Sequence, residues 1–457
     1  MKITTVRNTG ANRLLLLFTG WSTDERILAG NLPEGWDVAV AYDYSSLEPA
    51  GHLFDKYSAI YLFAWSLGVA AAAATLEGVK IDAAFAINGT EHPANDELGI
   101  PEAIFTATRE RLDERNLRKF RRRMFDSALD FEQAAALLPE SDDIELLKKQ
   151  LSTMQSSSPK ADIPWRRAYV ALDDRIIPAD NQMKAWQEHP ARPEIVSTHT
   201  PHFINAAAII SACTPDIPAI SRRFEKALST YDSHAEAQRI IADRLLELTL
   251  RESVPCPAVL EIGAGSGMFT RLYGPKLRPR SATFVDLYPT PRYNIAPLET
   301  YITKDAEQAA SDGTLLSGFE LILSASAIQW FAAPAAFFRN ASRLLTDNGA
   351  LICSSFAPGN LHELNTARPA PLLYHSAGEL REMCSRSFGE VSVSEEEIIL
   401  KFDSPREALL HLKHTGVAGG THSRSAISLL RALKRPDGTA TLTYRPIYIL
   451  ARNPRRQ

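Results

Sequence analysis

Residues 60–74 read Ile-Tyr-Leu-Phe-Ala-Trp-Ser-Leu-Gly-Val-Ala-Ala-Ala-Ala-Ala. The apolar run up to Ala64 indicates a buried strand, and the valine and alanines that follow Gly68 favour a helix. Ser66 stands at the junction, where small residues two before and two after it permit a sharp strand-to-helix turn. A serine on such a turn is a candidate nucleophile, and an ordinary serine at a strand–helix junction is the alternative.

Around this turn, short apolar runs alternate with helical stretches over the first 212 residues. The pattern predicts a mainly parallel sheet covered by helices, an α/β fold. The predicted strands are residues 14–18, 38–41, 60–64, 83–87, 168–172 and 194–197. Prolines interrupt any regular element at 213–220, and the length of the chain favours two cores. We therefore predict two domains, residues 1–215 and 221–457.

Two further residues supply the chemistry that a serine nucleophile needs. Asp174 and His202 each follow a predicted strand, which gives the chain order Ser, Asp, His of an α/β-hydrolase fold. His202 would accept the Ser66 proton as general base, and Asp174 would orient the imidazole. Asp173 and His199 are the neighbouring alternatives.

The backbone N–H groups of Leu67 and Trp21 are the candidate oxyanion donors, since one follows the nucleophile and the other follows the first strand. With the segments at 86–90, 99–101 and 116–124, these residues resemble the BioG-type pimeloyl-carrier-protein methyl ester esterases over most of residues 1–212. The resemblance implies an N-terminal α/β-hydrolase carboxylesterase. Its substrate would be the methyl ester of a pimeloyl chain on acyl carrier protein, in biotin precursor synthesis.

Residues 109–123 form a basic stretch, with eight basic side chains against three acidic ones and a local charge of +5. If the stretch is helical, Arg115, Arg118, Lys119 and Arg122 share an outward face. Such a face suits docking of an acidic carrier protein. A solvated helix surface and a nucleic-acid site are the alternatives.

A second motif, Glu-Ile-Gly-Ala-Gly-Ser-Gly, occupies residues 261–267 and follows a predicted strand at 258–262. Gly263, Gly265 and Gly267 allow the backbone to approach a ligand closely where a new helix opens. The same glycine pattern also occurs in NAD sites, so further residues must separate the two classes.

Acidic residues at later strand ends make that separation. Asp286 can bind ribose hydroxyls, and Asp305, followed by Ala306, can meet an adenine amino group. With Glu261 before the glycines and Ser324 ending a later strand, they resemble a class I, Rossmann-like S-adenosylmethionine-dependent methyltransferase. NAD binding remains the alternative.

Three more segments, residues 231–242, 326–330 and 354–364, resemble BioC, the malonyl-carrier-protein O-methyltransferase, over most of residues 221–450. The resemblance implies methyl transfer to the free malonyl carboxylate, with Tyr231 and Gln238 closing over S-adenosylmethionine. A carboxylate is already ionised near neutral pH, so this reaction needs positioning and no dedicated base.

The rest of the C-terminal half predicts a second sheet. A helix is expected over residues 222–250. Strands are expected at 258–262, 282–285, 320–323 and 350–354, with late runs at 398–402 and 441–450 closing an antiparallel edge.

Composition limits the remaining function classes. The 50 basic and 54 acidic residues give a net charge of −4, which offers no global attraction to nucleic acid or anionic lipid. Cys213, Cys256, Cys353 and Cys384 lie too far apart to suggest a metal cage or a disulfide framework, and the histidines show no metal spacing. With no apolar span or signal core, we expect a cytoplasmic protein.

Together the two halves predict one chain that makes and removes a methyl ester on carrier-bound acyl groups. Two other interpretations stay open. One is a nucleic-acid or small-molecule methyltransferase with a basic, non-catalytic N-terminal binding module, and the other is a catalytically idle scaffold.

Overall fold

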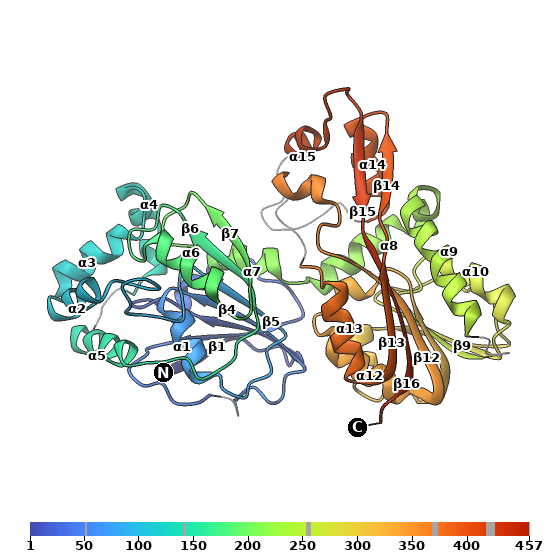
Figure 1. Cartoon of the computed structure of the whole chain (residues 1–457), viewed down its shortest axis with the longest axis horizontal. Helices are drawn as coiled ribbons and strands as arrows, with labels where there is room; N and C mark the ends of the chain where they lie inside the picture. The colour runs from blue at the N-terminus through green and yellow to red at the C-terminus, as the bar shows by residue number, and fades with distance from the viewer. Residues whose placement is uncertain (51–52, 140–142, 253–256, 368–372, 417–425, 457) are drawn as a thin grey trace. The chain divides into compact units, whose positions relative to one another are not determined.

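The computed structural model describes residues 1–50, 53–139, 143–252, 257–367, 373–416 and 426–456. The chain divides into two compact units, Met1–Ile210 and Ser211–Gln457 (Figure 1). Cys256 lies outside the described residues, and the other three cysteines are free thiols. Among the helices of the described residues, none has the length and apolar character needed to cross a bilayer.

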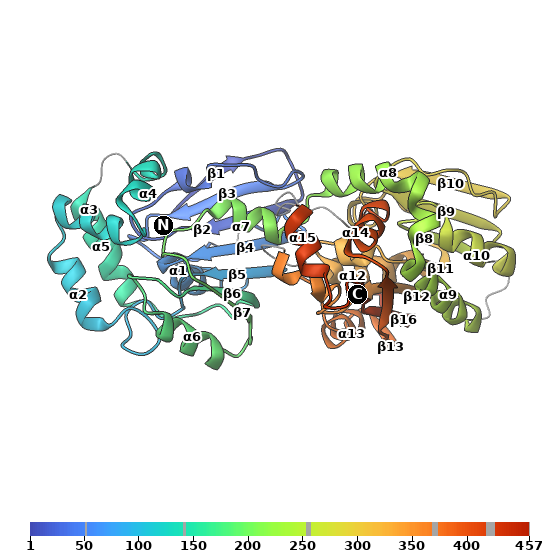
Figure 2. The same ribbon diagram turned by 90° about the horizontal axis from the view of Figure 1, so that it is seen from above.

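The N-terminal unit is built on a seven-stranded sheet with the order β1-β3-β2-β4-β5-β6-β7, which Figure 2 shows side by side. The strands are β1 (Lys2–Arg7), β2 (Arg13–Phe18), β3 (Asp37–Tyr42), β4 (Ala59–Trp65), β5 (Ala83–Ile87), β6 (Trp165–Ala171) and β7 (Glu194–Thr198). Strands β2–β7 pair in parallel, which confirms the predicted α/β fold. The sequence analysis missed β1, which pairs antiparallel with β3 at the edge.

Burial explains why these runs form the centre of the unit. Every residue of β2, β4 and β5 is buried, as expected for parallel strands covered on both faces. Helix α1 (Leu67–Thr75) is also buried along its whole length, so its alanines allow close packing on the sheet. At Gly68 a Cβ atom would collide with the Phe18 carbonyl oxygen, so only glycine permits this helix–strand approach.

The remaining helices of this unit surround the sheet. Those between β5 and β6 gather at one end of the unit in both views (Figures 1 and 2). They are α2 (Glu102–Glu110), α3 (Glu114–Arg123), α4 (Ala128–Gln133), the 3-10 turn η3 (Ala135–Leu137) and α5 (Ile144–Gln155). The others are η1 (Glu25–Leu28), α6 (Ala179–Glu188) and α7 (Ala206–Cys213).

The C-terminal unit has its own seven-stranded sheet, with the order β10-β9-β8-β11-β12-β16-β13. The strands are β8 (Ala258–Ile262), β9 (Ser281–Asp286), β10 (Leu298–Thr303), β11 (Phe319–Ser324), β12 (Leu345–Phe356), β13 (Phe388–Glu395) and β16 (Pro446–Pro454). Strands β8–β12 pair in parallel, and β16 pairs antiparallel with both β12 and β13. This is the Rossmann-like arrangement predicted for the methyltransferase half.

Two predictions for this unit were wrong in detail. Residues 398–402 do not join the main sheet, because β14 (Ile398–Phe402) pairs with β15 (Ala440–Tyr444) in a separate two-stranded sheet. The expected helix at 222–250 is two helices, α8 (Ile217–His234) and α9 (Glu236–Arg251), since Ala235 between them leaves the helical conformation. Strands β10 and β13 were not predicted.

The other helices cover the faces of this second sheet and its two-stranded extension. They are α10 (Met268–Leu277), α11 (Ala306–Ala309), η4 (Ile328–Trp330), α12 (Pro334–Leu344), η5 (His362–Ala367), α13 (Ala377–Ser385), α14 (Pro405–His414) and α15 (Ala426–Leu433). Residues of α9, α10, β8, β11 and β12 share one core cluster, so α9 and α10 cover a face of this sheet.

Candidate active sites

Ser66 sits on a strained turn between β4 and α1. Its backbone φ is +56°, a left-handed value that a residue with a side chain rarely adopts. Such strain persists only where the surroundings impose it, and here they do. A Cβ atom on Gly89 would collide with the Ser66 carbonyl oxygen, so the chain after β5 presses directly on the turn.

A continuous hydrogen-bonded relay leads from this serine. His202 Nε2 lies 2.9 Å from Ser66 Oγ, and His202 Nδ1 lies 2.7 Å from Asp174 Oδ2. Both the imidazole and the carboxylate are fully buried. With the Nδ1 proton donated to Asp174, Nε2 is left as an acceptor for the serine hydroxyl.

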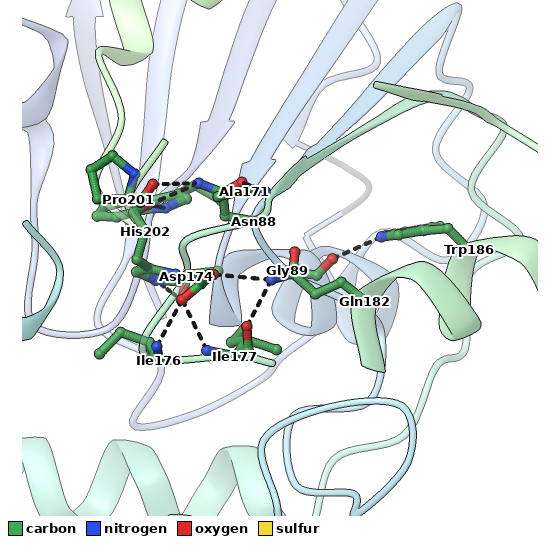
Figure 3. Close-up of polar contacts among 12 residues, drawn as sticks. Asn88, Gly89, Ala171, Asp174, Ile176, Ile177, Gln182, Trp186, Pro201 and His202 are labelled. Atoms are coloured by element: carbon green, nitrogen blue, oxygen red, sulfur yellow. Dashed lines mark hydrogen bonds and ion pairs between the residues drawn. The ribbon is translucent and has the colours of Figure 1, made fainter. Parts of the chain in front are cut away.

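Further hydrogen bonds fix the aspartate (Figure 3). Asp174 Oδ1 accepts from the backbone N–H groups of Ile176 at 2.7 Å and Ile177 at 3.0 Å. Asp174 Oδ2 accepts from Gln182 Nε2 at 2.9 Å, in addition to His202. The carboxylate thus has four donors, which hold it in one orientation.

The histidine is fixed through its backbone. Its carbonyl oxygen accepts from Asn88 Nδ2 at 3.0 Å and from Trp65 Nε1 at 3.1 Å. The sequence analysis assigned no role to Asn88 or Gln182, although Asn88 lies in the segment 86–90 that contributes to the BioG resemblance. Asp173 and His199, the alternatives to Asp174 and His202, are not part of the relay. They form a pair with each other, 3.4 Å apart, and His199 is exposed.

A cavity of about 250 Å³ opens beside Ser66. Helices α2, α3 and α5 contribute Ile104, Phe105, Phe120 and Leu151 to its apolar wall, and Arg123 and Arg175 are its cationic members. Trp21 and Leu67 also line it, and within the described residues neither of their backbone N–H groups donates a hydrogen bond. Both groups are therefore available to an oxyanion at this cavity.

Residues 114–123 of the basic stretch form α3, whereas Arg109 lies in α2. Not all of the basic side chains of α3 face solvent. Arg115, Arg118 and Lys119 are exposed, and Arg122 is half-buried and donates to the Phe125 carbonyl. Arg121 is buried and holds the Ser22 carbonyl oxygen at 2.7 Å, a structural role. The exposed residues together with Arg122 are called the α3 basic face below.

In the C-terminal unit, the glycine loop follows β8 and turns into α10. Gly263, Gly265 and Gly267 all have positive φ values, from +56° to +81°. The Gly265 N–H donates to Asp286 Oδ2 at 2.8 Å, which links the loop to the end of β9. At Gly267 a Cβ atom would collide with the Tyr293 ring, so the loop conformation depends on glycine.

A pocket of about 130 Å³ lies along this loop. It is lined by most of the residues predicted to bind the cofactor: Tyr231, Gln238, Glu261, Gly263, Gly265, Asp286, Asp305 and Ala306. Gly267 does not line it. Ser324 is placed differently, because it is fully buried, donates to the Ile262 carbonyl at 3.0 Å and does not line the pocket. Ser326 and Trp330 also line the pocket; their segment, residues 326–330, was part of the resemblance to BioC, but neither residue was assigned a role from the sequence.

Two carboxyl groups in this pocket have pKa values raised toward neutral pH. Burial raises the pKa of Glu261 to about 7, against the opposing hydrogen bonds from Thr270 and Tyr273. Burial likewise raises the pKa of Asp286 to about 6, although backbone N–H donors oppose the shift. A cationic ligand beside them would favour their charged forms.

Comparison with known proteins now gives the family. A family model described as pimeloyl-ACP methyl esterase BioG matches residues 1–209, and one described as a methyltransferase domain matches residues 231–387. A malonyl-[acyl-carrier protein] O-methyltransferase of Bacteroides fragilis (strain 638R) is 35% identical to this chain, covering 96% of it and 92% of that protein. The chain belongs to the malonyl-[acyl-carrier protein] O-methyltransferase family.

Other similar proteins each match about half of this chain. A malonyl-[acyl-carrier protein] O-methyltransferase of Porphyromonas gingivalis is 36% identical over 52% of this chain and 96% of its own length. The crystal structure of BioG from Haemophilus influenzae is 31% identical, covers 45% of this chain and 95% of that one, and has a TM-score of 0.41. The two resemblances seen in the sequence are confirmed, and membership of this methyltransferase family places the chain in biotin biosynthesis.

The methyl donor of this family is S-adenosylmethionine, and the pocket fits it. Gly263 and Gly265 leave backbone exposed to a ligand, and Asp286 and Asp305 lie at the ends of neighbouring strands. Buried polar atoms of Gln238, Ser326 and Trp330 have no partner within the described residues. Such atoms are costly to leave unpaired, so they indicate a polar ligand.

Proposed function

We propose that the two units carry out opposite steps on acyl groups bound to acyl carrier protein. The C-terminal unit methylates the free carboxylate of malonyl-acyl carrier protein. The N-terminal unit hydrolyses pimeloyl-acyl carrier protein methyl ester to pimeloyl-acyl carrier protein and methanol. The observation that carries the proposal is the Ser66–His202–Asp174 relay beside an apolar cavity, in a chain of a methyltransferase family.

In the hydrolytic step, His202 Nε2 takes the Ser66 proton as Oγ attacks the ester carbonyl carbon. Asp174 stabilises the imidazolium, and the N–H groups of Leu67 and Trp21 donate to the oxyanion. His202 then gives the proton to departing methanol, which leaves an acyl-enzyme. A water molecule activated by His202 releases the carboxylate in the same way.

In the methyl-transfer step, S-adenosylmethionine supplies an electrophilic methyl group. The glycine loop would bind it by backbone contact, with Asp286 toward the ribose hydroxyls and Asp305 toward the adenine amino group. Tyr231 and Gln238 close over the pocket and exclude water. Because the acceptor carboxylate is already ionised, these residues have only to hold and orient it.

Esterification has a physical purpose in this scheme. A free carboxylate at the end of a growing acyl chain would have to enter apolar elongation pockets unpaired, which costs several kcal/mol. A methyl ester enters as a neutral group. The esterase must then spare the short malonyl ester, and we propose that this ester, on a docked carrier, is too short to reach Ser66.

The α3 basic face is the proposed docking surface for the carrier. Arg115, Arg118, Lys119 and Arg122 would meet its acidic side chains, and Arg123 of the same helix lines the Ser66 cavity. Arg118→Glu should slow hydrolysis of the carrier-bound ester about tenfold at low salt and leave a small soluble ester unaffected. Lys160→Glu, at another exposed site of this unit, is the matched control.

The deciding experiment follows each acyl group by mass spectrometry. Malonyl-acyl carrier protein with S-adenosylmethionine should gain one methyl group, and pimeloyl-acyl carrier protein methyl ester should lose one. Ser66→Ala should abolish only the second reaction, because it removes the nucleophile and leaves the other unit intact. Equal hydrolysis by wild type and Ser66→Ala would contradict the esterase assignment.

A further inference from the structure

Two hydrogen-bond donors in the methyltransferase pocket have no role in the scheme above. Ser326 Oγ and Trp330 Nε1 are both buried, and neither has a partner within the described residues. Both residues line the pocket beside the glycine loop. Buried donors that lack acceptors cost free energy, so their persistence indicates that a ligand accepts from them.

The backbone around Ser326 is fixed, which leaves its hydroxyl for that ligand. The residue follows β11 with φ at +55°. Its N–H donates to Ser354 Oγ at 2.9 Å, and its carbonyl accepts from Gln329 Nε2 at 2.5 Å. A left-handed serine at a functional pocket is the kind of strain that a binding role explains.

The Trp330 indole is held by packing. Its ring meets Phe224 of α8 edge-on, with centroids 5.8 Å apart and planes at 74°. The Arg223 guanidinium lies 5.9 Å from the centre of the Trp330 ring. The indole is therefore kept in place, and the positive charge near its ring favours an anionic ligand in this part of the pocket.

The sheet order places these donors at one end of the pocket. Asp286 ends β9 and Asp305 follows β10, whereas Ser326 follows β11 on the other side of β8 and its glycine loop. A cofactor whose adenosine lies at the two acids has its sulfonium end toward β11. Ser326 and Trp330 then lie where the methyl acceptor must enter.

We infer that Ser326 Oγ and Trp330 Nε1 bind the carboxylate that receives the methyl group, an inference that rests on the proposed function. Both are donors, as an anion requires, whereas the unpartnered Gln238 Oε1 is an acceptor and suits a cationic group. One carboxylate oxygen accepts from the pair, and the other attacks the methyl carbon. The new O–C bond forms as the S–C bond breaks and sulfur keeps the bonding electrons.

The same pair distinguishes substrate from product. The acceptor is an anion before transfer and a neutral ester afterwards. Hydrogen bonds to an ionised acceptor are about twice as strong as those between neutral groups. The two donors therefore bind the free carboxylate more tightly than the methyl ester, which favours product release.

The test uses the full-length protein and the conservative variants Trp330→Phe and Ser326→Ala. Each keeps the shape of the pocket and removes one donor. Each should lower kcat/KM for malonyl-acyl carrier protein about 10- to 100-fold, mainly through KM. The dissociation constant for S-adenosylmethionine alone, measured by calorimetry, should stay within twofold of wild type.

Ser342→Ala is the control, because Ser342 is a buried serine of the same unit whose hydroxyl donates to the Arg339 carbonyl, and it does not line the pocket. Its kcat/KM should stay near the wild-type value. Unchanged kcat/KM in both donor variants overturns the inference, as does weakened binding of S-adenosylmethionine in the absence of acceptor. A wild-type protein that transfers no methyl group to malonyl-acyl carrier protein overturns the proposed function instead.

Discussion

The Ser66 site and the methyltransferase pocket differ in how far the protein satisfies their polar groups by itself. At the Ser66 site the catalytic relay is hydrogen-bonded within the protein, since Asp174 accepts from four donors and His202 bridges it to the serine, although Gln182 Oε1 has no partner within the described residues. In the pocket, Gln238, Ser326 and Trp330 bury polar atoms that have no partner within the described residues. One site is assembled before substrate arrives, and the other is completed by its ligands.

The difference follows from the two reactions. Ester hydrolysis develops charge on an oxyanion and an imidazolium, and fixed donors lower its barrier most when they need no rearrangement. Carboxyl methylation brings together two ligands that are already charged, so binding them in line supplies most of the catalysis. Ligand binding should therefore stabilise the C-terminal unit more than the N-terminal one.

The largest effect is expected from breaking the hydrogen-bonded Ser66–His202–Asp174 relay. Asp174→Asn should lower ester hydrolysis about 10⁴-fold, because the amide no longer holds the imidazole in the required tautomer. Asp173→Asn, one residue away and paired with exposed His199, is the matched control and should remain within a few-fold of wild type. Comparable losses in both variants, measured as kcat with a chromogenic ester, would contradict the assignment of Asp174.

Residues 60–74 were enough to predict the centre of the N-terminal fold. Their apolar run becomes β4, buried on both faces, and their alanines become the fully buried α1. Strand β1 was missed because it lies at a sheet edge, where several of its side chains are exposed and the apolar signal is weak. Ile398–Phe402 was misplaced because periodicity indicates a strand but not its partner.

A substitution in the glycine loop should weaken cofactor binding and leave the Ser66 site unaffected. Gly267→Ala puts a Cβ atom into the Tyr293 ring at a φ of +81°, so S-adenosylmethionine affinity should fall by about 100-fold or more. Gly313 has the same φ of +81° with open space around it, so Gly313→Ala carries only the backbone strain. Calorimetric titration of both variants separates the two causes. Equal affinities would show that the close approach at Gly267 is unimportant.

Sequence reasoning assigned roles to the site residues whose motifs demand a particular residue type, and assigned none to those that packing brings to the sites. Ser66 and the three glycines were recognisable because a turn and a close approach demand particular residue types. Gln182 reaches Asp174 from α6, and Trp330 reaches the pocket from a 3-10 turn. The roles of such residues can be recognised only from the hydrogen bonds and unpartnered atoms of the folded structure.

The smallest effect concerns the pH dependence of unfolding. The folded-state pKa of Glu261 is about 7 against an ordinary value of 4.5, because burial favours its neutral form. Between those values the unfolded chain has lost a proton that the folded chain keeps, so stability falls as pH rises, by up to about 3 kcal/mol. The unfolding transition of the C-terminal unit should therefore move down by roughly 5–10 °C between pH 5 and pH 8.

Glu261→Gln keeps an oxygen for the Thr270 and Tyr273 hydroxyls but cannot ionise, so it should flatten most of that slope, with a remainder from Asp286. Saturating S-adenosylmethionine should flatten it in wild type too, because a sulfonium cation beside Glu261 favours the carboxylate. The transition of the N-terminal unit, followed in the same calorimetric scans, is the internal reference. A slope that neither the substitution nor the ligand reduces would show that Glu261 does not report on the pocket. The contrast between the two sites would then depend only on the unpartnered polar atoms of Gln238, Ser326 and Trp330.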